Sequence, residues 1–209
     1  MPRSLLQRGL SFTRYPKYCA DLYLNLLFHV VLRRKGVEIG PGVRWYGMPI
    51  ISRAADSVMR IGAGARLCSR SSDTALGVNH PVVLRTLVAG ALLEIGEGVR
   101  MSGTSICAAQ RITIGSRCVI GANATIVDTD FHALAAQARS GPDDAKGARA
   151  CAVAIDDDVF IGAGAFILKG STIGAGAVIG AGSVLSGHVP AGAVFCGNPA
   201  RMVRASTSV

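Results

Sequence analysis

The chain has 209 residues, of which 50% are hydrophobic, 5% aromatic and 17% charged, and its formal net charge is +9. So apolar a composition excludes an intrinsically disordered chain. The sequence lacks the uninterrupted apolar run of ~18 residues that a membrane-spanning helix needs. It also lacks an apolar stretch leading to a small-residue cleavage site, so a secretory signal is not predicted and the expected location is the cytoplasm.

The positive charge is concentrated at the N-terminal end. Residues 1–36 hold seven lysines and arginines against Asp21 alone, a net charge of +6, and the other 173 residues carry only +3. Residues 16–35 are also rich in leucine and valine, which predicts a short helical arm. Such an arm could make peripheral contact with the inner face of a membrane, although a solvated helix flank explains the charge equally well. Nucleic-acid binding is not expected, because no reading motif accompanies the basic residues.

From residue 39 onward an aliphatic residue recurs every six positions. The series is clearest at Ile155, Ile161, Ile167, Ile173 and Ile179. Neither a helix, with a period of 3.6, nor an ordinary strand, with a period of 2, produces this pattern. It predicts a mainly β coil of short strands, in which each leading aliphatic side chain points inward and stacks on its counterpart in the next coil. Repeats of this kind bury their core only by stacking on one another.

Two stretches break the period, at residues 73–93 and 133–154. The second is polar and reads as a loop pushed out of the coil, and long loops in compact folds are often functional. The sequence therefore divides into a basic helical arm that caps the open end (1–36), the repeat domain (37–197) and a C-terminal tail (198–209).

Three segments resemble a known family: IGANATIVDTDFH (120–132), IGAGAFILKGSTIGAGAVIGAGSVL (161–185) and GNPARMVR (197–204). They are similar to the hexapeptide-repeat acyltransferases, and most of all to the bacterial sugar and polysaccharide O-acetyltransferases of the maltose and galactoside type. The resemblance implies a left-handed parallel β-helix. It further implies a homotrimer with acetyl-CoA bound between adjacent subunits.

The resemblance also assigns candidate catalytic residues. His132 falls where the family places its catalytic histidine, and a neutral imidazole near pH 7 suits a general base. Asp128 or Asp130 could orient the ring of His132, as the carboxylate does in other pairs of a histidine with an acidic residue, although aspartate is also common in turns.

Candidate binding residues follow from the loops and the small-residue repeats. For the acceptor we expect contacts from the first interruption and from the repeat at residue 101: Asn79, His80, Ser102 and Thr104. For acetyl-CoA we expect a wall of small residues along the pantetheine arm and basic residues at the phosphates: Gly162, Ala163, Gly164, Ala165, Lys169, Ala181, Ser183, Asn198 and Arg201.

The function expected from this resemblance is acetyl-CoA-dependent O-acetylation of a sugar or polysaccharide precursor. An N-acetyltransferase of an amino sugar or a serine-type acetyltransferase is the nearest alternative. A zinc-dependent hexapeptide carbonic anhydrase and a non-catalytic solenoid scaffold are alternatives of other classes. No metal is expected, because the four histidines are scattered without paired spacing and none of the six cysteines forms a CxxC motif.

Overall fold

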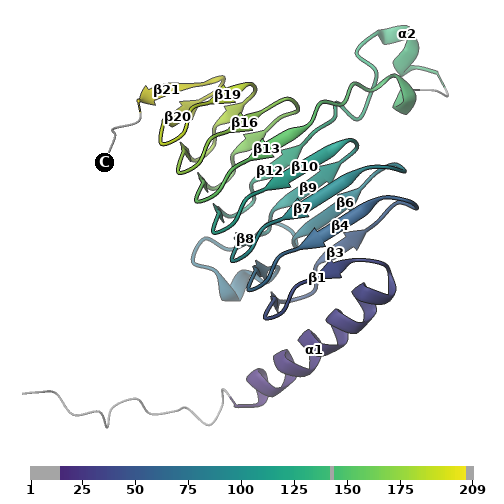
Figure 1. Ribbon diagram of the computed structural model, residues 1–209, viewed down its shortest axis with the longest axis vertical. Coiled ribbons are helices and arrows are strands. Elements are labelled where there is room, and N and C mark those ends of the chain that lie inside the picture. The colour runs from purple at the N-terminus through teal and green to yellow at the C-terminus, as the bar shows by residue number, and fades with distance from the viewer. Residues whose placement is uncertain (1–14, 142–143, 206–209) are drawn as a thin grey trace, which may run out of the picture.

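The computed structural model describes residues 15–141 and 144–205. The chain winds into one long coil whose wall consists of three parallel sheets (Figure 1). It passes through the three sheets in turn, so hydrogen-bonded neighbours within a sheet come from successive turns of the coil. Sheet I runs in the order β1 (Glu38–Ile39), β4 (Val58–Ile61), β7 (Leu92–Ile95), β10 (Arg111–Ile114), β13 (Val153–Ile155), β16 (Thr172–Ile173) and β19 (His188–Val189).

The other two sheets are built from successive turns of the coil in the same way. Sheet II contains β2 (Arg44–Tyr46), β5 (Arg66–Cys68), β8 (Arg100–Ser102), β11 (Val119–Ile120), β14 (Phe160–Ile161), β17 (Val178–Ile179), β20 (Val194–Gly197) and β21 (Ala200–Arg204). Sheet III contains β3 (Ile50–Ser52), β6 (Val83–Thr86), β9 (Ser105–Ala108), β12 (Thr125–Val127), β15 (Phe166–Ile167) and β18 (Val184–Leu185). The six-residue period is thus one strand with its turn.

The leading aliphatic residues form ladders inside the coil. In sheet I, Ile61 pairs in register with Ile39 on one side and Ile95 on the other, and all three side chains are buried. The same register continues along the sheet through Ile114, Ile155, Ile173 and Val189. The predicted inward stacking is confirmed, and it explains why the core needs aliphatic rather than aromatic side chains.

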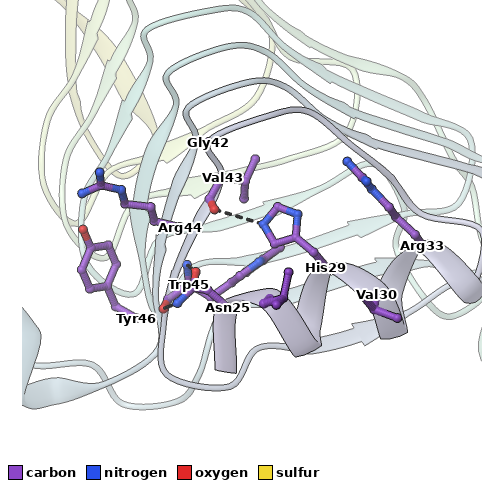
Figure 2. A pocket seen from close by; sticks show the side chains of 10 residues that line it. Asn25, His29, Val30, Arg33, Gly42, Val43, Arg44, Trp45 and Tyr46 are labelled. Carbon is purple, nitrogen blue, oxygen red and sulfur yellow. Dashed lines mark hydrogen bonds between the residues drawn. The ribbon is translucent and has the colours of Figure 1, made fainter. Parts of the chain in front are cut away.

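Helix α1 (Tyr15–Arg34) lies across the open end of the coil beside β1 (Figure 1). Leu32 is buried in the core, and the Asn25 side chain bonds both the backbone N–H and the carbonyl of Trp45, at 2.7 and 3.0 Å. His29 Nε2 lies 3.1 Å from the carbonyl of Val43 (Figure 2). These polar contacts fix the helix over the first coil, as a terminal cap requires. No helix in the described ranges is long and apolar enough to span a bilayer.

At two places the strands of the structure extend beyond the boundaries expected from the sequence. The first interruption ends before β6, because Val82, Leu84 and Leu93 are fully buried and belong to the coil, whereas only the stretch from η2 (Ser71–Asp73) to residue 81 leaves it. Residues 200–204 are not a separate tail but strand β21, which pairs antiparallel with β20. Beyond the buried Ala200, residues 201–204 of β21 are exposed, so no hydrophobic period marks this strand.

The second interruption, expected at residues 133–154, lies between β12 (Thr125–Val127) and β13 (Val153–Ile155). The chain leaves the coil after β12 and returns at β13, and Thr129 and Ala150 form an antiparallel bridge at its base. The loop carries α2 (Ala136–Arg139) and η3 (Asp144–Gly147) and projects from the side of the coil (Figure 1).

Candidate active site

His132 lies at the base of the projecting loop, and its side chain is 67% exposed. The preceding residue, Phe131, has a φ of 63°, a left-handed conformation that is uncommon for an aromatic residue. The Thr129 Oγ1 accepts the Phe131 N–H at 3.2 Å, and the Asp130 N–H donates to the Arg149 carbonyl at 3.1 Å. These contacts hold the strained turn that presents His132, and backbone strain of this kind clusters at functional sites.

The carboxylate that contacts His132 is Asp144, from η3. Its Oδ2 bonds the imidazole Nδ1, and its Oδ1 accepts the Ala133 N–H at 2.8 Å. The hydrogen bond with His132, followed by that from Ala133, lowers the pKa of Asp144 below its ordinary value. An ionised Asp144 makes Nδ1 the donor, so Nε2 is the ring nitrogen left to accept a proton. This is the arrangement of a general base with an orienting carboxylate.

Asp128, one of the two predicted orienting carboxylates, does not contact His132. Its side chain is completely buried and accepts the backbone N–H groups of Ala109, Gln110 and Arg111, each at 2.7 Å. A carboxylate in this position satisfies the donors of the turn between β9 and β10. Its role in the structure is to hold two coils together.

Asp130, the second predicted orienting carboxylate, is also engaged elsewhere. Lys169 Nζ lies 2.5 Å from Asp130 Oδ1, and both side chains are largely shielded from solvent. The pair ties the base of the loop to the next coil, after β15. Lys169 was predicted to meet a phosphate of CoA, but its ammonium group faces this carboxylate.

The predicted acceptor residues come from two adjacent segments of the chain, but they differ in exposure. Ser102 is half-buried and lines a cavity of about 490 Å³ beside the first interruption, whereas Thr104 is completely buried inside the coil. Asn79 is exposed, and its backbone N–H donates to Asn123 Oδ1 at 2.8 Å. His80 is half-buried, with Nδ1 lying 2.8 Å from the Pro81 carbonyl. Thr104 is therefore a structural residue, because its hydroxyl is shielded from any ligand.

The predicted cofactor wall divides into buried and accessible positions. Ala165 and Ser183 are fully buried, and Ser183 Oγ accepts the Gly197 N–H at 3.0 Å. A Cβ on Gly162 would lie 2.4 Å from the backbone nitrogen of Ala181, so the close stacking of coils already requires this glycine. The positions that face outward are Ala163, Gly164, Ala181, Asn198 and Arg201.

Gly164 and Gly182 stand in equivalent turns of successive coils, both with a φ of 66° and with nothing within 4 Å of an added Cβ. One edge of the coil thus presents backbone without side chains, a surface on which a narrow chain such as pantetheine could lie. The exposed Arg201, whose Nη1 donates to the Ala200 carbonyl at 2.9 Å, stands on β21. The chemistry of these positions fits a ligand with a thin flexible arm and an anionic end.

Asp144 was not predicted as a site residue. It lies 12 residues beyond His132 in a polar loop, and only its position in that loop distinguished it from other surface aspartates. In the part of the chain that the structure describes, no group of three or more His, Cys, Asp or Glu side chains could hold a metal ion.

Two family models match the repeats. The bacterial transferase hexapeptide model matches residues 153–187, and the model of the hexapeptide repeat of succinyl-transferase matches residues 111–127. A search of the curated proteins gives no significant match.

Several solved structures share the fold. AntD, an N-acyltransferase from Bacillus cereus in complex with dTDP and 3-hydroxybutyryl-CoA, is 18% identical with a TM-score of 0.64, covering 86% of this chain and 88% of its own. A point variant of AntD has been solved with dTDP-4-amino-4,6-dideoxyglucose and coenzyme A. A hexapeptide-repeat acetyltransferase from Vibrio cholerae is 20% identical with a TM-score of 0.55, covering 93% of this chain and 91% of its own. Galactoside acetyltransferase in complex with coenzyme A is 19% identical with a TM-score of 0.53, covering 96% and 84%.

At these identities the structural likeness establishes the fold, which is the left-handed parallel β-helix. The resemblance to the hexapeptide-repeat acyltransferases is confirmed in the repeats and in this fold.

Proposed function

We propose that this protein is an acetyl-CoA-dependent acetyltransferase that modifies a sugar or a sugar conjugate. The observation that carries the proposal is the pairing of His132 with Asp144 at the base of the projecting loop. The fold is shared with acyltransferases whose structures contain coenzyme A, and two of those proteins are named for or bound to a sugar. Both facts favour transfer to a saccharide acceptor.

The proposed mechanism is direct transfer. Acetyl-CoA supplies the acetyl group as a thioester. His132 Nε2 takes the proton of the acceptor hydroxyl or amine as that group bonds to the acetyl carbon. The carbon–sulfur bond breaks, and the imidazolium returns the proton to the departing thiolate. Asp144 holds the ring with Nε2 outward and stabilises its positive charge while the proton is held.

Acetyl-CoA would lie along the edge of the coil formed by the turns of Gly164 and Gly182. The small residues Ala163 and Ala181 beside them leave the backbone accessible, and Arg201 would meet a phosphate of the nucleotide end. A hydroxyl is the proposed acceptor group. An amine is the alternative, favoured by the N-acyltransferase AntD.

We propose a homotrimer as the working form. His132 is too exposed in one chain to exclude water from the reaction, and a neighbouring subunit packed beside it would cover the ring. The outer face of sheet III also exposes apolar side chains at Ile50 and Phe166, as an interface between subunits would require. Sedimentation equilibrium measures this state directly.

Peripheral membrane contact through α1 is a further proposal. The helix exposes Tyr23, Leu26 and Leu27, and its last turn ends in Arg33 and Arg34. Apolar side chains followed by a basic cluster suit an anionic lipid surface. In vesicle sedimentation, replacing Leu26 and Leu27 by serine should abolish binding, and unchanged binding would remove the proposal.

A free-thiol assay with acetyl-CoA and a panel of sugars, amino sugars and their nucleotide conjugates tests the function. We expect acceptor-dependent release of CoA and a mass increase of one acetyl group on the acceptor. Mass spectrometry of the product before and after mild base distinguishes an ester from an amide. The absence of CoA release with every acceptor, together with the absence of CoA binding in calorimetry, would favour a scaffold instead.

A further inference from the structure

Three arginines form a column on the outer face of sheet II. Arg44, Arg66 and Arg100 are directly opposite one another in register, on β2, β5 and β8, and all three are exposed. Neighbouring strands lie about 4.8 Å apart, so the three guanidinium groups form a closely spaced row. Like charges directly opposite each other destabilise a sheet.

In sheet I, by contrast, the arginine at these coils is flanked by acidic residues. Arg60 on β4 is in register with Glu38 on β1 and Glu94 on β7. Its Nε lies 2.9 Å from Glu38 Oε2, and its Nη1 lies 4.0 Å from Glu94 Oε1. In these same coils, therefore, sheet I neutralises its arginine within the protein. In the described ranges, Arg44, Arg66 and Arg100 have no ion pair or side-chain hydrogen bond.

The arginine column borders two adjoining cavities. Arg66 and Arg100 line the cavity of about 490 Å³ together with Ser102, and one wall of it is the first interruption at residues 73–76. Tyr46 lines this cavity as well. Arg44 and Tyr46, which extend from the same strand, both line the neighbouring cavity between α1 and β2 (Figure 2). Asp73, the carboxylate in the wall, is neutralised by Arg70, with Nε and Oδ2 2.6 Å apart.

We propose that the arginine column binds the phosphate groups of an anionic ligand, most naturally the diphosphate of a diphosphate-linked sugar. Guanidinium groups pair with phosphate oxygens in bidentate fashion, and a row of three suits a linear diphosphate better than a single phosphate. Ser102 and Tyr46 supply hydroxyl groups beside the row, which suit the polar parts of a nucleoside or sugar. The identification of this ligand as the acyl acceptor rests on the proposed function, but the anion site itself does not.

The test is calorimetric binding of inorganic pyrophosphate to the full-length protein. Arg66→Gln and Arg100→Gln are the test variants, singly and together, and Arg60→Gln is the matched control because it removes the same charge from sheet I. Each test variant should weaken pyrophosphate binding roughly tenfold, whereas Arg60→Gln leaves it unchanged. Binding should also weaken as ionic strength rises. Equal affinity in test and control variants would overturn the proposal.

The source of the diphosphate is distinguished by two further probes, dTDP in solution and phosphatidylcholine vesicles with or without a polyisoprenyl diphosphate. If Arg66→Gln and Arg100→Gln weaken the binding of dTDP, the diphosphate belongs to a nucleotide. If they weaken the binding of the vesicles that contain polyisoprenyl diphosphate, it belongs to a lipid. Retention of pyrophosphate binding in His132→Ala shows that the site stands even if the proposed catalysis fails. An unchanged KM for acetyl-CoA in the double variant is expected, and a raised KM would reassign the column to the acyl donor. A change of oligomeric state in the double variant would reassign it to a subunit interface and overturn the proposal.

Discussion

The imidazole of His132 is held through Nδ1 by the carboxylate of Asp144, a residue of the same loop, and not by either of the acidic residues that precede it in the sequence. The carboxylate is anchored in turn by the Ala133 N–H at 2.8 Å. The imidazole and the carboxylate that contacts it are therefore both carried by the segment that leaves the coil.

Replacing Asp144 by asparagine should lower kcat/KM by about 10- to 100-fold, the range found for carboxylates that orient metal-bound histidines. Steady-state kinetics with acetyl-CoA and an accepted sugar measures the change, on protein whose unfolding curve matches that of wild type. A folded Asp144→Asn variant with the kcat/KM of wild type would show that the Asp144 carboxylate does not assist the imidazole.

The contact should also make stability depend on pH in a defined window. The pKa of Asp144 is lowered in the folded protein, chiefly by its hydrogen bond with His132. Its contribution is therefore fully present above the ~3.9 of an unfolded aspartate and is lost as the pH falls through the lower folded-state pKa. The difference in unfolding free energy between wild type and Asp144→Asn should narrow below that window. A difference that grows on acidification would contradict the assigned contact.

The six-residue period was sufficient to predict the coil, because one strand and its turn bury one aliphatic side chain, as Ile61 and Ile95 do. The position of His132 also followed from the sequence. Its partner did not, because the approach of Asp144 depends on how the loop folds, which no periodicity records. The arginine column was likewise hidden, since Arg44, Arg66 and Arg100 are separated by unequal lengths of chain and become neighbours only through strand register.

Asp128 gives a test of structure rather than of catalysis. Replacing it by alanine leaves three backbone N–H groups without an acceptor, which should lower the free energy of unfolding by roughly 3 kcal/mol or more. Denaturant titration measures the change. The free energy of unfolding of Asp128→Asn, which keeps one acceptor oxygen, should lie between those of wild type and Asp128→Ala. An alanine variant as stable as wild type but without activity would return Asp128 to the catalytic site.

Lys169 distinguishes a structural ion pair from a contact with CoA. Lys169→Met should lower the free energy of unfolding by about 1.5–3 kcal/mol, because the shielded Asp130 carboxylate loses its charged partner. The KM for acetyl-CoA should stay unchanged. The reverse result, full stability with a raised KM, would show that Lys169 meets the acyl donor.

The most direct measurement is kcat/KM of His132→Ala with acetyl-CoA and an accepted sugar, made on protein whose oligomeric state and unfolding curve match wild type. Loss of the proton acceptor should reduce kcat/KM by ~10²–10⁴-fold, the range of general acid–base catalysis. Binding of CoA, which does not depend on the imidazole in this account, should be retained. Turnover equal to that of wild type in the folded variant would contradict the assignment of His132 as the general base.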